Sequence, residues 1–223
     1  MARYLMTHSL MSSWLYALKE NPFEDAATER DPLAEFMSTL NREQRSPNAA
    51  MINGITFEDL VTAILSKTQM FEYYEMDKRT EVIRQCRIKP AEHKWYGAAC
   101  RVAGIVSGGV LQYKVSKAVE VGGLTLFLYG RLDCLKSGEI YDIKFSKGYD
   151  RGKYISSTQH PTYLKLVPEA RGFTYIVSNG SEVWTERYRR DETLSILPTI
   201  SDFLNWMRTM GFLDTYKEKW QAK

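Results

Sequence analysis

The chain has 223 residues, of which 44% are hydrophobic, and a formal net charge of +3 at pH 7. This composition is typical of a globular protein and excludes an intrinsically disordered chain, while the small net charge argues against a polyelectrolyte nucleic-acid coat. The chain has no apolar run of about eighteen residues and no signal-peptide pattern, so we expect a cytoplasmic protein with no membrane partner.

In the first half of the chain, apolar residues recur mainly with the period of a helix. Two short amphipathic helices are expected at 9–20 and 31–43, separated by the polar stretch NPFEDAATERDP. A third helix is expected from its N-cap Thr56 to Leu65. The stretch from 77 to 106 is also expected to be mainly helical, with a break near Pro90.

After Gly108-Gly109 the pattern changes to that of strands. The expected elements are three strands, a helix that ends near Val167, a hairpin with an Asn-Gly turn and a helical tail; the strands span 111–121, 124–134 and 140–145, the hairpin 172–189 and the tail begins at Thr193. This order predicts an α+β fold, with one sheet and helices packed on it. We divide the chain into a helical lead-in (1–53), a core (54–192) and a C-terminal helical segment (193–223) of one compact domain.

The stretch YGRLDCLKSGEIYDIKFSK, residues 129–147, contains the chemistry. With Ser137-Gly138 at the turn, Asp133 lies opposite Asp142 in the predicted hairpin. Since side chains alternate along a strand, one face carries the polar set Arg131, Asp133, Asp142 and Lys144. The other face carries the apolar set Leu132, Cys134, Tyr141, Ile143 and Phe145.

Two carboxylates that face each other across a hairpin destabilise a sheet. A shared proton, a divalent cation or the neighbouring Arg131 and Lys144 would each offset the repulsion. The spacing alone leaves these three explanations open. It also predicts that Asp142→Asn stabilises the protein in the absence of metal.

This hairpin, together with GITFEDLV upstream and QHPTY downstream, resembles the PD-(D/E)XK nuclease superfamily. The similarity extends from about Gly54 to Arg190 and is strongest to the RecB-like branch, which includes phage recombination exonucleases. The resemblance implies a restriction-endonuclease-like core, a mixed sheet flanked by helices, and metal-dependent hydrolysis of DNA. It favours a phage-encoded exonuclease of recombination or repair, with a recombination protein partner and a homo-oligomer as further implications.

In this resemblance, Asp133 is the first motif acid and Asp142 and Lys144 form the D-x-K motif. Leu132 stands where the motif has proline. The two acids, with the backbone carbonyl of Ile143, are then ligands of Mg²⁺ or Mn²⁺. Part of the branch also carries a four-cysteine iron–sulfur cluster, and the three scattered cysteines of this chain cannot supply one, so no cluster is expected.

Glu58 is the candidate third metal ligand, because FE in an early helix often supplies an acid in the related nucleases. Its predicted place in the first turn of a helix has a simpler explanation, since the helix dipole favours an acid there. Asp59 is the nearest competitor and would instead cap the helix with Thr56.

Gln159 and Tyr163 match the Q-x-x-x-Y motif of the same branch. Four residues apart on a helix, they share one face, with Thr158 as the expected N-cap and Pro161 in the first turn. The functional interpretation is that Gln159 supports the metal-site residues and Tyr163 braces it. The alternative is a surface glutamine and a half-buried tyrosine.

The segment KFSKGYDRGK, residues 144–153, holds as much net positive charge as the whole chain. Tyr149 and Tyr154 lie among its cations Lys147, Arg151 and Lys153, as in segments that bind DNA phosphates. We expect this loop, with Tyr163, to contact DNA and its glycines to allow ordering on DNA. The alternative is an ordinary solvated loop, and the alternative for the whole chain is a non-catalytic nucleic-acid- or partner-binding module.

Overall fold

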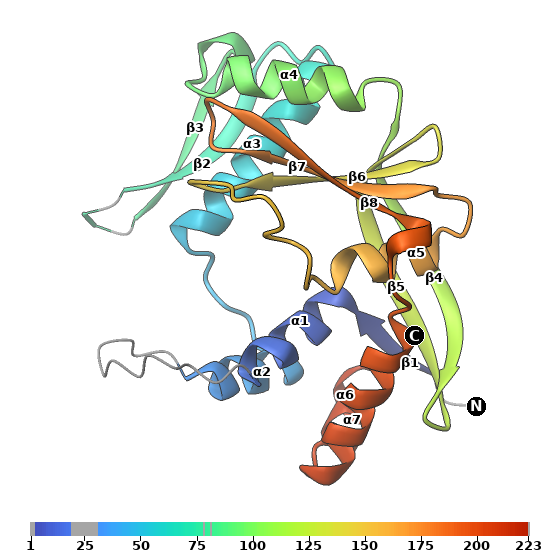
Figure 1. Cartoon of the computed structure of the whole chain (residues 1–223). Coiled ribbons are helices and arrows are strands. Elements are labelled where there is room, and N and C mark those ends of the chain that lie inside the picture. Colours follow the sequence, from blue (N-terminus) through green and yellow to red (C-terminus); the bar gives the residue numbers. More distant parts are fainter. Residues whose placement is uncertain (1–2, 19–30, 78, 81, 223) are drawn as a thin grey trace.

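A computed structural model of the protein describes residues 3–18, 31–77, 79–80 and 82–222 (Figure 1). The predicted α+β fold is confirmed, with seven α-helices and a mixed six-stranded sheet in the described residues. The elements are β1 Arg3–Thr7, α1 His8–Ala17, α2 Pro32–Leu40, α3 Ala49–Leu65, β2 Phe71–Met76, β3 Ile83–Ile88, α4 Tyr96–Val106, β4 Val110–Val121, β5 Leu124–Lys136, β6 Glu139–Phe145, α5 Gln159–Leu166, β7 Gly172–Ser178, β8 Val183–Arg189, α6 Leu197–Thr209 and α7 Leu213–Lys219.

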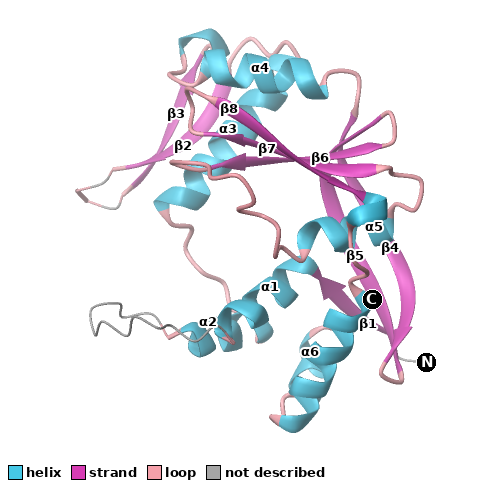
Figure 2. Ribbon diagram, in the orientation of Figure 1, coloured by secondary structure: helices cyan, strands magenta, loops and turns pink. Residues whose placement is uncertain are grey.

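The long strand β5 organises the sheet (Figure 2). One of its edges pairs with β4, and the other pairs first with β1 and then, near its end, with β6. The strands β7 and β8 follow β6 in spatial order. The pairs β1–β5 and β6–β7 are parallel and the remaining pairs antiparallel. The sheet therefore splits along β5, with β1 and β6 on the two sides of the split.

Helices cover both faces of this sheet. One core joins the sheet to α1, α2, α5, α6 and α7, and the other joins it to α3, α4 and the two-stranded sheet β2–β3. Successive residues of β7 alternate between them, since Tyr175 and Val177 belong to the first core and Ile176 to the second. Within the described ranges, no helix is long and apolar enough to cross a membrane.

The predicted strands 111–121, 124–134 and 140–145 correspond to β4, β5 and β6 within a few residues. The hairpin 172–189 is also confirmed, with Gly180 at the turn in the left-handed region (φ +91°). The helical tail corresponds to α6 and α7. The expected end of the first helix at residues 19–20 and the polar loop at 21–30 lie outside the described residues.

Two predictions of local structure are wrong, and one strand was not predicted. The stretch 77–106 is not mainly helical, because β3 occupies its first part; β2 and β3 pair as a hairpin whose turn lacks the glycine or Asn-Gly signal that would have indicated it. The strand β1 was not predicted, since its five residues merge with the pattern of α1. The third helix does not begin at Thr56: its N-cap is Asn48, and the buried Thr56 hydroxyl donates to the carbonyl of Tyr74 (3.1 Å).

Candidate active site

The turn between β5 and β6 has the predicted register. Cys134 pairs with Tyr141, Leu135 with Ile140 and Lys136 with Glu139. Ser137 and Gly138 both have positive φ, at +51° and +76°, as a two-residue hairpin turn that follows strand twist requires. This register places Asp133 and Asp142 at the next position along the two strands.

The two strands separate at that position. Backbone pairing of β5 and β6 ends at Cys134 and Tyr141. Beyond this point a side chain replaces the backbone acceptor, because Asp133 Oδ2 accepts a hydrogen bond from the N–H of Ile143 (2.8 Å). The register of β4 and β5 also omits Gln112 opposite Asp133, and Gln112 has φ of +52°. Asp133 therefore occupies an irregular point of both ladders, where the sheet opens.

This irregularity changes which residues share a face. Leu132 belongs to the core around α5, whereas Cys134 belongs to the core around α3 and α4. The prediction that both lie on one apolar face is therefore wrong, because it assumed unbroken alternation along β5. Residues of β6 do alternate as predicted, and Tyr141 and Ile143 lie with Cys134.

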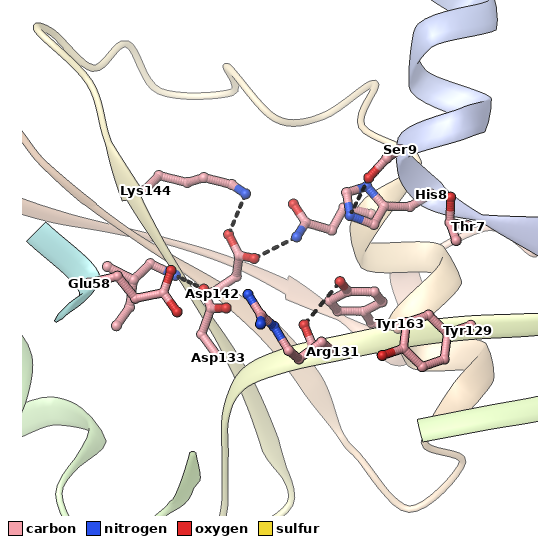
Figure 3. A pocket seen from close by; sticks show the side chains of 13 residues that line it. Thr7, His8, Ser9, Glu58, Tyr129, Arg131, Asp133, Asp142, Lys144 and Tyr163 are labelled. Carbon is pink, nitrogen blue, oxygen red and sulfur yellow. Dashed lines mark hydrogen bonds and ion pairs between the residues drawn. The ribbon is translucent and has the colours of Figure 1, made fainter. Parts of the chain in front are cut away.

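A pocket of about 320 Å³ opens at the split (Figure 3). Its walls come from the β1–α1 junction, α3, β5, β6 and α5, and they include the acids, the lysine, Gln159 and Tyr163 named from the sequence. The lining residues are Thr7, His8, Ser9, Glu58, Tyr129, Gly130, Arg131, Asp133, Asp142, Ile143, Lys144, Gln159 and Tyr163.

Asp142 is the most deeply enclosed acid, with 3% of its surface exposed. Gln159 Nε2 donates a hydrogen bond to its Oδ1. Lys144 Nζ forms an ion pair with its Oδ2 (2.8 Å). Burial lowers the pKa of Lys144, but the negative charge of Asp142 and its contact with the ammonium group outweigh this effect and raise that pKa. Each oxygen of Asp142 thus has a neighbour, Gln159 at Oδ1 and Lys144 at Oδ2.

Asp133 and Glu58 complete an acidic wall. Burial, followed by the charges of Asp142 and Glu58, raises the pKa of Asp133 well above its usual value. Burial also raises the pKa of Glu58, whose carboxylate accepts a hydrogen bond from Gln112 Nε2. A proton, a metal cation or the neighbouring Arg131 and Lys144 would each offset the repulsion among these acids.

The predicted location of Glu58 within its helix is wrong, although its place in the pocket agrees with the sequence. It is the tenth residue of α3, because the helix begins at Ala49, so the helix dipole does not explain it. The pocket lining includes Glu58 and not Asp59. Of the two competing acids, Glu58 is therefore the one that faces Asp133 and Asp142.

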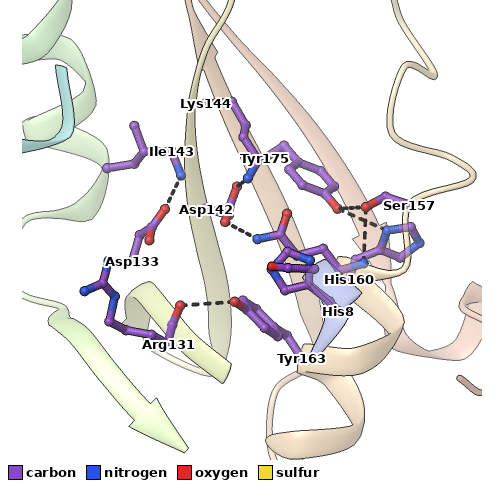
Figure 4. Close-up of polar contacts among 12 residues, drawn as sticks. His8, Arg131, Asp133, Asp142, Ile143, Lys144, Ser157, His160, Tyr163 and Tyr175 are labelled. Carbon is purple, nitrogen blue, oxygen red and sulfur yellow. Dashed lines mark hydrogen bonds and ion pairs between the residues drawn. The ribbon is translucent and has the colours of Figure 1, made fainter. Parts of the chain in front are cut away.

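Gln159 and Tyr163 both face the pocket from α5, as their spacing predicts; Figure 4 shows Tyr163 beside Arg131. The Tyr163 hydroxyl donates to the carbonyl of Arg131 (3.2 Å) and so ties α5 to β5. Pro161 lies in the first turn, but Thr158 does not cap the helix with its side chain. Its hydroxyl instead contacts Ser12 Oγ (2.7 Å) and the carbonyl of His8 (3.0 Å), so it joins α5 to α1.

His8 lines the pocket and was not predicted as a site residue. Its ring meets Tyr163 edge to face, with centroids 5.4 Å apart. Burial, and then the charge of Lys144, lowers its pKa to about 4, so the imidazole is neutral at pH 7. No spacing in the sequence indicates this role, because His8 reaches the site through the unpredicted strand β1, which pairs with β5.

The basic loop, residues 146–154, is tied to the sheet rather than solvated throughout. The Tyr149 hydroxyl (2.6 Å) and the Gly152 N–H (3.3 Å) both donate to Glu186 Oε2. Tyr154 stacks on Tyr175 with a centroid distance of 4.2 Å. Both tyrosine side chains therefore contact residues of the sheet.

The three cations of the basic loop, Lys147, Arg151 and Lys153, are exposed and lie outside the pocket lining. Lys153 Nζ donates to Ser146 Oγ (2.8 Å) within the loop. We call these three residues the loop cations. Their role in DNA binding stays a prediction.

The residues of the pocket fit a hard divalent cation in part. Among the described residues, no three His, Cys, Asp or Glu side chains form a metal-ligand group. Asp133 and Asp142 line the same pocket, however. The N–H of Ile143 points toward Asp133, and the carbonyl of the same strand residue points the same way. Mg²⁺ commonly takes one or two carboxylates and completes its shell with water and substrate oxygens, so this donor set suits it.

Comparisons with known proteins leave the family open. No family model matches the chain, and no curated protein matches it in sequence. One solved structure, described as "Crystal structure of SSO0001", aligns with a TM-score of 0.40 and 14% identity over 80% of this chain and 86% of that chain. A similarity of that size carries no argument about fold or function.

Proposed function

We propose that the protein is a metal-dependent nuclease that hydrolyses phosphodiester bonds of DNA. The observation that supports this most is the pocket at the split of the sheet, where Asp133, Asp142 and Lys144 meet. A structural ion pair alone would not gather a third acid, Glu58, beside them.

Asp133 and Asp142, with the carbonyl of Ile143, are the residues that would hold Mg²⁺ or Mn²⁺, and Glu58 is the acid nearest to join them. When bound, such an ion lowers the pKa of a coordinated water and stabilises negative charge on the phosphate. Asp133 keeps Oδ1 for this purpose, because its Oδ2 accepts the N–H of Ile143.

Lys144 is a charged neighbour of the reacting phosphate in this arrangement. Its side chain would neutralise phosphate charge, or orient or help deprotonate the attacking water. Gln159 fixes the rotamer of Asp142 through its hydrogen bond to Oδ1. Tyr163 positions β5 through the carbonyl of Arg131.

The finer assignment follows the sequence resemblance: a cytoplasmic, phage-encoded exonuclease of recombination or repair, with a homo-oligomer and a recombination protein partner as further expectations. The second candidate is a binding module that keeps the fold without catalysis. The complete set of Asp133, Asp142, Lys144 and Gln159 in one pocket favours the enzyme.

Labelled linear and circular DNA, incubated with the purified protein and either Mn²⁺ or EDTA, tests the proposal. We expect metal-dependent loss of linear DNA, whereas nicking of circles would indicate an endonuclease. Lys144→Ala should lose most of the activity, and Lys117→Ala, which removes an exposed lysine of β4 outside the pocket and the basic loop, is the matched control. Absence of cleavage of every DNA and RNA substrate would favour the binding module.

A further inference from the structure

A second pocket lies beside the first residue of β6, where the β5–β6 turn, the start of β7 and the end of β8 meet. Its volume is about 560 Å³, and its lining is Arg171, Arg187, Arg189, Arg190 and Asp191. We call it the arginine pocket. None of these residues lines the candidate active site, so the proposed nuclease reaction does not account for them.

Carboxylates hold two of the arginines by one edge of the guanidinium group. Arg187 donates to Glu139 from Nε (2.9 Å) and Nη2 (3.0 Å), and Arg189 donates to Asp191 from Nε (3.0 Å) and Nη2 (2.7 Å). Arg171 is held by a different contact, from its Nη2 to the carbonyl of Ser137 (2.8 Å). Three exposed guanidinium groups therefore keep fixed positions around the pocket.

Arg190 has a structural role in the same wall. It donates to the carbonyls of Leu164 (2.7 Å), Val167 (2.6 Å) and Ala170. These carbonyls lie in the last turn of α5 and just beyond it, where backbone acceptors lack partners within the helix. Arg190 thus stabilises the end of α5, and the remaining three arginines are available to a ligand.

Gly172, the first residue of β7, leaves space for the side chains of Glu139 and Arg187 to lie against the backbone. A Cβ at Gly172 would lie 2.8 Å from Glu139 Oε1 and 3.1 Å from Arg187 Nε. The first contact is shorter than real Cβ atoms show and the second is tighter than usual, so a side chain at position 172 would displace the ends of the Glu139 and Arg187 side chains. The first ion pair of the pocket is therefore seated against the backbone, with Glu139 largely buried (13% exposed).

Charge is not balanced in this cluster. Four arginines face three carboxylates, Glu139, Asp191 and Glu192, and only Asp191 lines the pocket. The carboxylates take the Nε–Nη2 edges of Arg187 and Arg189. Within the described residues no hydrogen bond reaches the Nη1 of either arginine, so donors remain on the side away from the carboxylates.

Fixed guanidinium groups with spare donors match phosphate oxygens, which accept two parallel N–H bonds from one arginine. Exposed ion pairs alone add little stability, and gathering like charges opposes folding, so stability does not explain the cluster. We propose that the arginine pocket binds a phosphate-bearing anion, either a backbone phosphate of a nucleic acid or a free polyphosphate.

Calorimetric titration with sodium tripolyphosphate, at about 0.15 M salt to suppress nonspecific attraction, tests the proposal. Wild type should bind, and Arg171→Gln with Arg189→Gln should weaken binding at least about tenfold, since charge-assisted bonds are lost. The matched control is Arg84→Gln with Arg87→Gln on β3, which removes two exposed, ion-paired arginines elsewhere. It should change the affinity less than about twofold.

Two further measurements identify the ligand chemistry. A lysine double variant at positions 171 and 189 keeps the charge without the planar fork and should bind more weakly than wild type. A single-stranded oligonucleotide in EDTA that displaces tripolyphosphate would identify nucleic acid as the source; failure to displace it would identify a free polyphosphate. The proposal is overturned by absent binding in wild type, by equal loss in both glutamine variants, or by equally tight binding of a hexaglutamate peptide, which would indicate an acidic protein partner.

Discussion

Replacing Asp133 by asparagine should stabilise the metal-free protein. From the sequence spacing, Asp142→Asn was the expected stabilising change. The structure moves the prediction to Asp133, because Asp142 forms an ion pair with Lys144 at 2.8 Å and accepts from Gln159. Asparagine at 142 would place an amide N–H₂ or a neutral oxygen against the ammonium group. At 133, asparagine keeps an oxygen for the N–H of Ile143.

The magnitude follows from the causes of the raised pKa of Asp133. Burial is the largest cause, followed by the negative charges of Asp142 and Glu58. A like-charge pair across strands contributes up to about 1 kcal/mol, so removing the pair with Asp142 should raise the free energy of unfolding by roughly 1 kcal/mol. For a domain of this size, that corresponds to a rise in Tm of about 2–4 °C.

Thermal melts in EDTA measure the stability of the metal-free protein, and melts in millimolar Mn²⁺ measure the stability gained from metal binding. Wild type should gain stability from Mn²⁺, by about 2.7 kcal/mol at a hundredfold excess over Kd, and Asp133→Asn should lose most of that gain. Asp142→Asn should melt below wild type in EDTA, and Asp150→Asn, in the basic loop, is the near-neutral control. If Asp133→Asn melts lower than wild type in EDTA and gains as much from Mn²⁺, the acids do not form a metal site.

Three other predictions concern Gln159, the loop cations and His160. Gln159→Ala should reduce DNA cleavage less than Lys144→Ala does, because Gln159 orients Asp142 without being a ligand; an equal or larger loss in a cleavage assay would contradict this. Neutralising the three loop cations together should flatten the plot of log affinity against log salt by about 2–3 in slope, and an unchanged slope would place the DNA elsewhere. Burial lowers the pKa of His160 from 6.5 to about 4, so its contribution to stability is complete above pH 6.5 and is lost as the pH falls toward 4. The loss is at most about 3 kcal/mol, and denaturant unfolding at several pH values should show that part of the decline absent in His160→Phe.

The local pattern was sufficient to predict the hairpin that carries the acids. Ser137-Gly138 is a strong turn signal, and period-2 alternation fixes register near the turn, so the pairing of Cys134 with Tyr141 was predictable. The separation of the two strands beyond this pairing was not predictable. The sheet opens at Asp133 because β1 and β6 share one edge of β5, and a parallel strand that arrives from residues 3–7 leaves no signal in the hairpin itself.

The missing parts of the candidate site have the same origin. His8 enters through β1, and the location of Glu58 depended on a helix start that the sequence placed at Thr56 instead of Asn48. Asn48 is a good N-cap, but the residues after it, AAMING, include a glycine and an asparagine that read as a loop. Packing against β2 and α4 overrides that local preference. The chemistry of the site residues could therefore be predicted from the sequence, whereas the long-range packing that brings His8 and Glu58 to the site could not.

Gly130 links that long-range packing to the site and gives a final test. It lies in β5 between the pairing with β1 and the split, and a Cβ there would lie 2.6 Å from Tyr163 Cε1 and 3.0 Å from Leu166 Cδ1. The ring of Tyr163 is 4% exposed, so it has little room to move aside. α5 therefore approaches β5 this closely only because residue 130 has no side chain.

Gly130→Ala should displace α5 and with it Gln159, the residue that orients Asp142. Overpacking of this kind typically costs 1–3 kcal/mol, which a denaturant melt measures directly. Metal-dependent cleavage should fall more than stability alone explains, because the hydrogen bond from Tyr163 to the carbonyl of Arg131 is strained as well. Gly104→Ala on the exposed face of α4 is the matched control, since a Cβ there has nothing within 4 Å. Equal stability and cleavage in the two variants would show that the approach of α5 to β5 does not position the site.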